Sequence, residues 1–498
     1  MFFEVSPPGA IKPQVPVAVF VILLFVPFAL AFSAFKVDDA YISFVYAKNL
    51  MQGNGLTYNG MVVEGYSNFL WTILVAPFIA LNVDPLVAAR CLSLLSACII
   101  LLVTEKLIRQ LNPGISNLGV FLALTTLGLS TPFAAWTMGG LETMLMALWV
   151  NLFVYLERSL EQRVAFLSLL VVLAAALTRP EGAMLFPLLI IYRLVYKKQA
   201  LRQILSNSLL FAIPFGLYLL WRYLTYGYWI PNTAFVKLNS GWKTTLDALS
   251  WLFSYWATRP LLALLVALAA MRLGAARALF NRDWGLVTLT TLTFGVFVLY
   301  AGSDWMPYYR FLVPIVPLLS LFIARALVSF VSPIYQRLAR AVLLSAVLLE
   351  VIFAVTIHLP YAPQFGDYTE GLIRGGKWIR QTTSPQDVIA VVDAGALAYY
   401  SERRTIDIMG LNNEHIAHSR GKDDPAYVLA QHPRVVQLHI AFSPTGQIQS
   451  DERDDNNWTL YKHPDFQHTY VPLVEVTVDP FFPFLFIRQS GVLNEIKR

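Results

Sequence analysis

Charged groups that interrupt long apolar runs are the residues of this 498-residue chain best suited to chemistry. Two adjacent carboxylates, Asp38 and Asp39, follow the first apolar run and precede Tyr41. Adjacent carboxylates repel one another, so one of them gains proton affinity or both need a nearby cation. Either arrangement suits a general base that accepts a proton from a hydroxyl group. The alternative is structural, because an aspartate can also cap the helix expected over 41–51.

A polar segment further along offers groups that bond sugar hydroxyls. Glu64, Tyr66 and Asn68 supply a carboxylate, an aromatic ring and an amide within five residues. An ordinary polar loop at the membrane interface has the same composition, so both interpretations stay open. The preceding loop, 53–60, is rich in glycine, but it lacks the strand and helix context of a phosphate-binding P-loop. We therefore expect no phosphate site there.

Two further carboxylates and an arginine lie at helix ends. Glu142 comes at the outer start of a short helix, where the helix dipole alone favours a carboxylate. Arg179 is followed by Pro180, Glu181 and Gly182, which interrupt the apolar pattern. A charge at membrane depth is costly and indicates function by default, although Arg179 can also pair with Glu181.

Two more cations stand beside aromatic runs. Arg222 and Lys237 flank a segment rich in Tyr and Trp that includes Asn232, a composition typical of an interfacial aromatic belt. Belt membership does not explain cations on the outer side, whereas binding of an anionic phosphate does. Asp304 and Arg310 repeat the pattern, and these two residues can also pair with each other.

The composition defines the elements that must position these groups. Hydrophobic residues make up 57% of the chain, charged residues 14%, and the mean hydropathy is +0.57, which excludes a soluble globule. The pI near 9.1 does not indicate a nucleic-acid partner, because the cations form short clusters between apolar runs, as membrane topology signals do. The expected partner surface is the lipid bilayer.

The apolar runs predict a polytopic α-helical membrane protein with about eleven transmembrane helices. Clusters of Arg and Lys near 158–163, 193–202, 272–282 and 337–340 are expected in the cytoplasm. The same parity places the first loop, 36–67, on the opposite face with the acidic pair. Asn68–Val83 breaks this parity if it crosses the membrane, so we expect it to lie along the outer face or to re-enter from it.

After residue 360 the pattern changes to mixed polarity and predicts a small α/β domain over 361–498, on the outer side of the membrane domain of 1–360. Its expected elements are a helix over 368–382 and strands over 388–393 and 405–409. His415 either lines an acceptor cleft from this domain or has a structural surface role.

Histidine and cysteine add constraints. All seven histidines lie at or beyond the end of the apolar region, so chemistry at the membrane domain must use carboxylates. Cys91 and Cys98 are about 10 Å apart along one helix, which is too far for a disulfide. External carboxylates can hold a divalent ion, but we expect neither a metal nor a cofactor.

An ordered set of motifs resembles a known class of enzymes. Asp38-Asp39, Glu64-Gly65-Tyr66-Ser67-Asn68, Leu141-Glu142-Thr143, Thr178 to Gly182 and Asp393-Ala394-Gly395-Ala396-Leu397 are similar to motifs of the GT-C superfamily of integral-membrane glycosyltransferases. Within that superfamily the likeness is to the terminal arabinofuranosyltransferases of mycobacterial cell walls and their bacterial relatives. The tail of 138 residues is shorter than the external domains of those enzymes, which leaves the acceptor open.

The resemblance implies inverting transfer of a sugar, arabinofuranose or another pentose, from a polyprenyl-phosphate donor to a glycan, lipid or protein acceptor. The reaction would occur at the periplasmic face of a bacterial inner membrane, with Asp38 or Asp39 as the base. The donor phosphate would bind Arg179, Arg222, Lys237 and Arg310. Sugar or acceptor would contact Tyr41, Glu64, Tyr66, Asn68, Glu142, Glu181, Asn232, Asp304 and His415. The competing classes are a transporter or flippase of lipid-linked sugars and a non-catalytic glycan-binding subunit.

Overall fold

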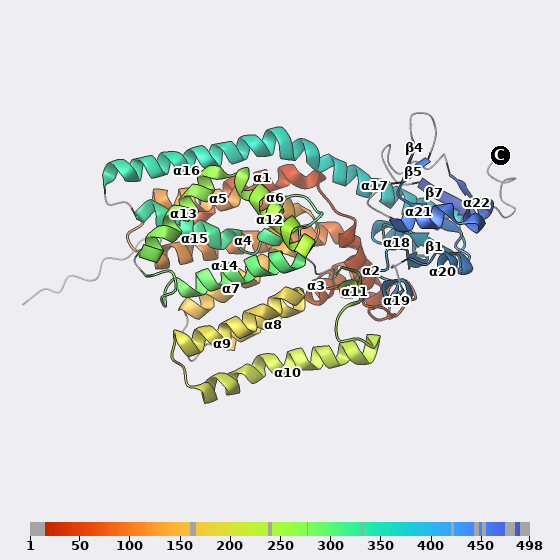
Figure 1. Ribbon diagram of the computed structural model, residues 1–498, viewed down its shortest axis with the longest axis horizontal. Helices are drawn as coiled ribbons and strands as arrows, with labels where there is room; N and C mark the ends of the chain where they lie inside the picture. Colours follow the sequence, from red (N-terminus) through yellow and green to blue (C-terminus); the bar gives the residue numbers. More distant parts are fainter. Residues whose placement is uncertain are drawn as a thin grey trace, which may run out of the picture.

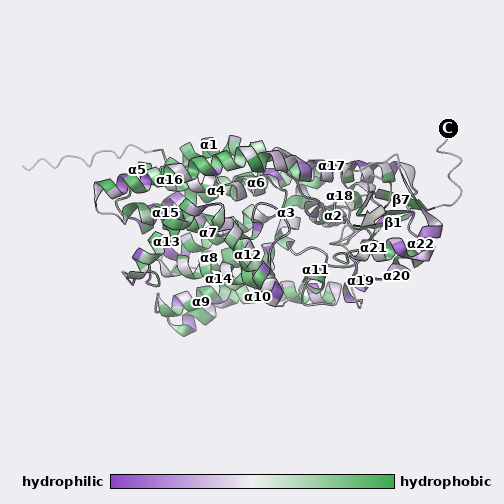
Figure 2. Cartoon of the chain, turned by 45° about the horizontal axis from the view of Figure 1, so that its top comes forward, coloured by the Kyte–Doolittle hydropathy of each residue, from purple (hydrophilic) through white to green (hydrophobic). Residues whose placement is uncertain are grey.

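The computed structural model is a helical bundle joined to a smaller α/β domain (Figure 1). It describes residues 15–159, 166–237, 242–275, 277–329, 332–419, 423–442, 448–450, 455–473 and 484–488. Apolar colour dominates the bundle, whereas the C-terminal domain is mixed (Figure 2). This distribution matches the change in composition near residue 360.

Four described helices are long and apolar enough to cross a bilayer. They are α1 (Val17–Ala31, continued by η1, Phe32–Ala34), α4 (Pro85–Leu111), α10 (Leu201–Tyr226) and α16 (Pro333–Phe353). Large apolar side chains on α10, such as Leu209, Leu217 and Leu224, are exposed, as lipid contact requires. The opposite face of α10 stacks Phe211 on Phe186, with ring centroids 4.2 Å apart.

Two pairs of helices form one broken element each. Helices α5 (Asn117–Gly128) and α6 (Thr131–Met138) meet at 52°, and α12 (Trp242–Ala257) and α13 (Pro260–Ala275) meet at 101°. The remaining bundle helices are shorter. They are α2 (Asp39–Met51), α3 (Phe69–Ala80), α7 (Thr143–Ser159), α8 (Phe166–Thr178), η3 (Pro180–Met184), α9 (Leu185–Val195), α11 (Asn232–Lys237), α14 (Gly285–Ala301), η4 (Arg310–Leu312) and α15 (Val316–Val328).

The described helices do not by themselves establish that the chain crosses the membrane eleven times. By length and composition the structure has four candidate spans, or six if each broken pair is one span, so the number eleven stays a prediction. Helix α3 has 12 residues and is about 18 Å long at the usual helical rise. That length is too short for a hydrocarbon core of about 30 Å, as expected of a re-entrant or interfacial segment.

One continuous helical path connects the bundle to the C-terminal domain. Helix α16 passes through a single π-helical turn, Ala354–His358, into α17 (Leu359–Thr382), so that 50 residues form one element. A Cβ atom on Gly366 of α17 would lie 2.0 Å from the carbonyl oxygen of Ala34. The two backbones are therefore in direct contact, and glycine is needed for this approach.

The C-terminal domain is built on a five-stranded sheet of order β2-β1-β3-β7-β6. Strand β1 (Val388–Val391) pairs in parallel with β2 (Arg404–Asp407) and β3 (Val435–Leu438), while β7 (Phe484–Arg488) runs antiparallel to β3 and β6 (Tyr470–Pro472). The other elements are β4 (Ile440–Phe442), β5 (Ile448–Ser450), α18 (Ala396–Ser401), α19 (Glu414–His418), α20 (Pro425–Ala430), α21 (Asp455–Lys462) and α22 (Pro464–Thr469). The expected helix over 368–382 and both expected strands are thus confirmed, although each strand ends about two residues early.

The ends of the bundle differ in character. The turns between α9 and α10, α13 and α14, and α15 and α16 lie at the end remote from the C-terminal domain (Figure 1). Three of the four Arg and Lys clusters expected in the cytoplasm, at 193–202, 272–282 and 337–340, lie in or beside those turns. The C-terminal domain occupies the opposite end.

Candidate active site

The acidic pair lies at the end of the bundle that faces the C-terminal domain. Asp38 precedes α2 but makes no side-chain bond to the amides of that helix, so it is not a helix cap. Its Oδ2 instead accepts a hydrogen bond from Gly395 N (2.9 Å) and its Oδ1 accepts one from Ala396 N (2.7 Å). Burial raises the pKa of Asp38, and the carboxylate of Asp393 raises it further. Asp39 is the first residue of α2.

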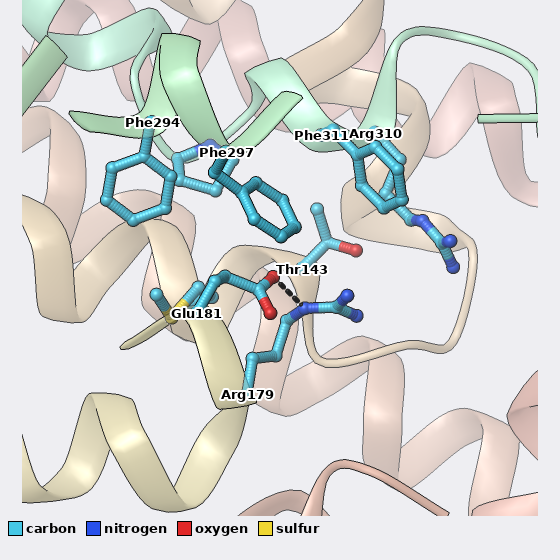
Figure 3. Close-up of a pocket in the computed structure, with 9 residues that line it drawn as sticks. Thr143, Arg179, Glu181, Phe294, Phe297, Arg310 and Phe311 are labelled. Carbon is cyan, nitrogen blue, oxygen red and sulfur yellow. Dashed lines mark hydrogen bonds and ion pairs between the residues drawn. The ribbon is translucent and has the colours of Figure 1, made fainter. Parts of the chain in front are cut away.

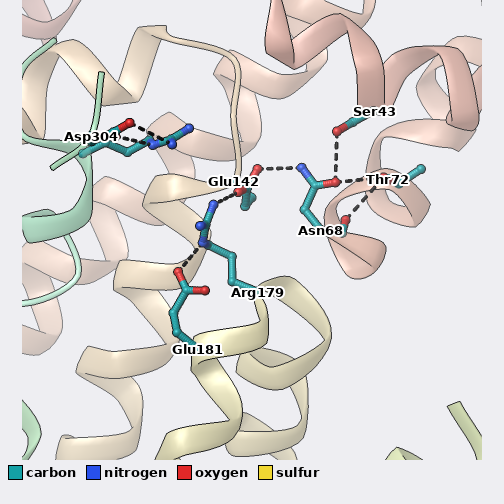
Figure 4. Close-up of polar contacts among 8 residues, drawn as sticks. Ser43, Asn68, Thr72, Glu142, Arg179, Glu181 and Asp304 are labelled. Atoms are coloured by element: carbon teal, nitrogen blue, oxygen red, sulfur yellow. Dashed lines mark hydrogen bonds and ion pairs between the residues drawn. The ribbon is translucent and has the colours of Figure 1, made fainter. Parts of the chain in front are cut away.

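A buried polar network extends from α2 into the bundle (Figure 4). Ser43 Oγ donates to Asn68 Oδ1 (2.9 Å), and Asn68 Nδ2 donates to Glu142 Oε2 (2.6 Å). Arg179 Nη1 then pairs with Glu142 Oε1 (2.5 Å), and Arg179 Nε pairs with Glu181. Glu142 is 2% exposed, so its charge depends on these partners.

A second arginine lies beside this network on a different segment. Arg310 pairs with Asp304, with 2.8 Å between Nε and Oδ2 and 3.2 Å between Nη2 and Oδ1. Its guanidinium lies over the rings of Trp136 (5.5 Å) and Phe311 (5.1 Å). The preceding Tyr309 has a φ of 52°, in the left-handed region that non-glycine residues rarely occupy. Such backbone strain is often found at functional sites.

The two arginines line one recess between α7, η3, α14 and η4 (Figure 3). Its polar wall is formed by Arg179, Glu181 and Arg310, and its apolar wall includes Phe294 and Phe297. The recess is narrow, because the free volume between these side chains is about 10 Å³, roughly the space of one water molecule.

Arg222 and Glu64 form a separate buried pair. Arg222 Nε lies 2.9 Å from Glu64 Oε2, and the remaining guanidinium nitrogens donate to Trp229 O (3.0 Å) and Tyr218 OH (2.6 Å). Neither residue lines the recess of Arg179 and Arg310. Their partners indicate that they hold the first loop against α10.

Three more of the expected binding residues are buried in contacts within the protein. Tyr66 packs on Tyr46, with centroids 4.6 Å apart, and Tyr41 is 1% exposed. Asn232 Nδ2 donates to Gly410 O (2.8 Å), and Asn232 N donates to Glu64 O (2.9 Å). These contacts connect the first loop to the C-terminal domain.

His415 and Lys237 complete the set. His415 stacks on Tyr427 at 4.0 Å, and its Nε2 lies 2.9 Å from Asp424 Oδ2 at the surface of the C-terminal domain. The neighbouring His418 packs on Phe235 of α11, with centroids 4.3 Å apart. Lys237 ends α11, and its side chain lies outside the described part of the structure.

The structure adds a polar cluster that the sequence indicated only through Asp393. Tyr368 OH donates to Asp393 Oδ2 (2.5 Å), Gln437 Nε2 donates to the same oxygen (2.7 Å), and His439 Nε2 lies 2.7 Å from it. Burial alone would raise the pKa of Asp393, but His439 and the hydrogen bonds hold it below the usual value. The available signal was the alternation of Gln437 and His439 at the end of a strand.

A second addition is a buried ion pair between the two broken helices. Glu350 Oε1 accepts from Arg259 Nη2 (3.0 Å) at the break of α12 and α13. The same oxygen accepts from Thr131 N (2.9 Å) at the start of α6. Glu350 is the only carboxylate within the apolar run 340–357, which is the sequence signal that could have identified it.

No set of three or more His, Cys, Asp or Glu side chains in the described ranges is placed to hold a metal ion. Asp39 and Asp393 are close enough to Asp38 to raise its pKa. Backbone amides bond Asp38, and Gln437, Tyr368 and His439 bond Asp393.

Comparisons with known proteins gave a family match for the C-terminal part of the chain and a structural likeness for nearly the whole chain. Residues 364–477 match a family model described as a domain of unknown function, DUF8728. No curated protein matches the sequence. The whole chain resembles solved membrane proteins at low identity, so these likenesses concern the fold.

The crystal structure of ArnT from Cupriavidus metallidurans bound to undecaprenyl phosphate is 14% identical and has a TM-score of 0.61, covering 96% of this chain and 98% of that chain. The archaeal oligosaccharyltransferase AglB from Archaeoglobus fulgidus, in complex with an inhibitory peptide and a dolichol-phosphate, is 10% identical with a TM-score of 0.53, covering 88% and 74%. The chain therefore has the fold of these two proteins.

Proposed function

We propose that this protein is an inverting glycosyltransferase that transfers a sugar from a polyprenyl-phosphate donor. The observation that carries the proposal is the recess in which Arg179 and Arg310 lie together beside apolar walls, at the end of the bundle that bears the acidic pair. The fold adds support, because the similar structures of ArnT and AglB are complexes with undecaprenyl phosphate and with a dolichol-phosphate, respectively. An anion attached to an isoprenoid matches a recess with cationic and apolar sides.

The ion pairs of the recess leave donors for a phosphate. Arg179 uses Nε and Nη1 for its carboxylates, and Arg310 uses Nε and Nη2 for Asp304. Among the described residues, none accepts a hydrogen bond from Nη2 of Arg179 or from Nη1 of Arg310. We infer that the carboxylates orient the two guanidinium groups while these remaining amino groups bind the phosphate oxygens.

The reaction needs one proton acceptor and one site for developing negative charge. A carboxylate of the Asp38–Asp39 pair removes the proton of the acceptor hydroxyl, and the acceptor oxygen forms a bond with the anomeric carbon. The bond from that carbon to the phosphate oxygen breaks on the opposite face, and the polyprenyl phosphate leaves with the electron pair. Arginine donors stabilise that leaving group without protonating it.

The sugar and the location belong to the proposal as well. We propose a pentose such as arabinofuranose because the five ordered motifs resemble those of terminal arabinofuranosyltransferases. The proposed acceptor is a glycan, lipid or protein at the periplasmic face of a bacterial inner membrane. We place Lys237 and the buried pair of Arg222 and Glu64 at the same periplasmic face. Of these residues, Lys237 is a further candidate for contact with the donor phosphate.

A transporter of lipid-linked sugars is the second candidate, and one observation favours it. Transporters place broken helices and ionisable groups near the midplane, and here two broken helix pairs meet at the ion pair of Glu350 and Arg259. A transporter moves its lipid-linked sugar without breaking the bond to phosphate. Chemical consumption of the donor therefore separates the two candidates.

The test is transfer of labelled sugar in proteoliposomes that contain purified protein, polyprenyl-phosphoryl arabinofuranose and extracted cell-envelope glycans. We expect labelled glycan with release of polyprenyl phosphate, and a loss of about 100-fold in Arg310→Gln, as for removal of one oxyanion donor. The matched control is Arg337→Gln near the start of α16, because Arg337 is exposed and no described carboxylate forms an ion pair with it. Intact donor that only changes leaflet would contradict the proposal and favour transport.

A further inference from the structure

We infer that the buried ion pair of Glu350 and Arg259 positions Arg310 in its recess by holding the strained backbone at Tyr309. The inference rests on the proposed function and deepens it, because it assigns a part in phosphate binding to two charged residues outside the recess. Neither Glu350 nor Arg259 lines that recess, so both are positioning residues and not catalytic residues.

The ion pair needs an explanation other than stability, because its two charges lie within the apolar bundle. The side chains of Arg259 and Glu350 are 3% and 8% exposed, with 3.0 Å between Nη2 and Oε1. Taking two charges out of water costs about as much free energy as their attraction returns, so a buried pair is weak evidence of stabilisation. Charged residues within the apolar part of a membrane protein indicate a function by default.

The guanidinium group of Arg259 lies against two aromatic rings. It is 4.6 Å from the centroid of the Tyr255 ring and 5.5 Å from that of the Tyr309 ring. Contacts between a cation and a ring are most favourable where water is excluded. The Tyr309 ring also packs on Trp251 (5.2 Å) and Tyr255 (5.1 Å), and its hydroxyl oxygen lies 3.2 Å from Ser254 Oγ. The ring of Tyr309 is therefore held by α12 and by the break that follows this helix.

The backbone that carries this ring is strained. Tyr308 and Tyr309 have φ angles of 60° and 52°, so two successive residues other than glycine are in the left-handed region. The side chain of Tyr308 has different partners, because its hydroxyl donates to His358 O (2.9 Å) and its ring packs on Phe35 (5.0 Å). Strained conformations persist only where the surrounding structure holds them. The contacts of the two tyrosine side chains supply that support.

Glu350 also anchors a second support of the same turn. Its Oε1 accepts from Thr131 N (2.9 Å) at the start of α6. Trp136 on that short helix donates through Nε1 to Pro307 O (3.2 Å), and its ring centroid lies 5.5 Å from the guanidinium carbon of Arg310. One carboxylate thus connects both of the helices that support the turn 307–310.

The direction of Arg310 depends on this turn. Arg310 begins η4, and Leu312 N donates to Tyr309 O (3.0 Å) across the start of that element. The Arg310 side chain bonds Asp304 and lines the recess together with Arg179. Relaxation of Tyr309 to an ordinary backbone conformation would displace the guanidinium group within the recess. A misplacement of about 1 Å can cost roughly 100-fold in rate.

A cycle of single and double variants in the transfer assay tests the positioning role. Glu350→Gln removes the charge and keeps an oxygen that can accept from Thr131 N. We expect it to lower kcat/KM for the donor about 10-fold, with the KM for the acceptor unchanged, because Arg310 is displaced and not removed. Combined with Arg310→Gln, it should be no slower than Arg310→Gln alone, since both changes impair the same contact. Losses that multiply, or wild-type transfer by Glu350→Gln, would overturn the inference.

Further variants separate positioning from folding. Arg259→Met combined with Glu350→Gln leaves no unpaired charge, and replacement of both members of a buried pair often preserves stability. This double variant should show the same loss as Glu350→Gln, and wild-type transfer would contradict the inference. Tyr309→Ala should lose transfer to the same extent. Tyr309→Phe keeps the ring and should recover most of that loss, and failure to recover would show that the ring is not the support.

The control is Glu157→Gln, which removes another buried carboxylate. Glu157 lies 2.6 Å from Arg193 and about 21 Å along α7 from Thr143 of the recess. We expect this variant to transfer sugar at the wild-type rate. A loss equal to that of Glu350→Gln would show that any buried carboxylate has the same effect, and would overturn the specific role of Glu350.

Amide hydrogen exchange of peptides covering 303–313 tests the support of the turn without requiring activity. We expect faster exchange in Glu350→Gln than in the wild-type protein, and wild-type exchange in Glu157→Gln. Equal exchange in the two variants would overturn the inference. If the wild-type protein transfers no sugar, the proposed function fails, and the exchange comparison alone decides whether the ion pair holds the turn.

Discussion

At the level of single residues, partnership rather than residue type determines what each charged group can do. Arg179, Arg222 and Arg310 are equivalent in the sequence as cations beside apolar runs. In the structure Arg222 is surrounded by Glu64 and two oxygen acceptors, whereas Arg179 and Arg310 border a recess. The Arg222 and Glu64 partners are 158 residues apart, so a single sequence contains no signal that pairs them.

The electrostatics around Asp38 lead to a prediction about pH. The negative charges of Asp393 and Asp39 both raise the pKa of Asp38. Asp393 is itself bonded by Tyr368 and His439. Since the pKa of Asp38 is raised, its carboxylate is protonated as pH falls through a higher value than for an ordinary aspartate. Protonation converts one acceptor oxygen into a donor and breaks one bond to the turn. Activity should therefore decline on the acid side earlier than an unperturbed aspartate would require.

Asp393→Asn tests the cause of that shift. All three side chains that bond Asp393 meet its Oδ2, and the single amide oxygen of asparagine can replace this acceptor. Removal of the negative charge should lower the pKa of Asp38 and move the acid limb of the pH profile of kcat to lower pH. Glu402→Gln, a surface carboxylate paired with Lys48 and Arg380, is the control and should leave the limb in place. A shift to higher pH would contradict the assignment.

At the level of elements, the sequence predicted what depends on local periodicity and composition. The helix over 368–382 and the strands beginning near 388 and 405 are present, because mixed polarity and β-branched runs favour them locally. The same reasoning placed a domain boundary at 360, where polarity changes. The backbone does not break there, since α16 continues through a π-helical turn into α17. The change in composition therefore marks where the helical path leaves the apolar environment, and not where the helix ends.

Gly366 provides a test of this rigid connection. An alanine methyl group at position 366 would clash with the carbonyl oxygen of Ala34, so α17 would have to move away from η1. We expect Gly366→Ala to destabilise the protein by about 1–3 kcal/mol, as overpacking usually does. A methyl group at Gly295 on α14 would have no other atom within 4 Å, so Gly295→Ala should be neutral or slightly stabilising. Thermal unfolding in detergent measures both, and equal midpoints would contradict the close approach.

At the level of the whole molecule, the proposed function depends on contacts between segments that are far apart in the chain. Ser43 of α2, Asn68, Glu142 and Arg179 form one connected network, and the motif at 393–397 bonds Asp38, just before α2, from the C-terminal domain. The order of the motifs predicted a common site through family resemblance. Neither hydropathy nor charge could show that the turn at 394–396 lies against Asp38, because that contact depends on how the domain docks.

The polarity of the molecule gives the last prediction. The first loop and the C-terminal domain share one end of the bundle, and the Arg-rich and Lys-rich turns lie at the other. Anionic lipids and the positive-inside rule favour those turns in the cytoplasm. We therefore expect a membrane-impermeant maleimide to label Asn54→Cys and Gln386→Cys on intact spheroplasts, and Lys198→Cys only after permeabilisation. All three positions are exposed, and the background should lack Cys91 and Cys98. Labelling of Lys198→Cys on intact spheroplasts would show the opposite orientation in the membrane. The acidic pair would then face the cytoplasm, where it could not reach a periplasmic acceptor.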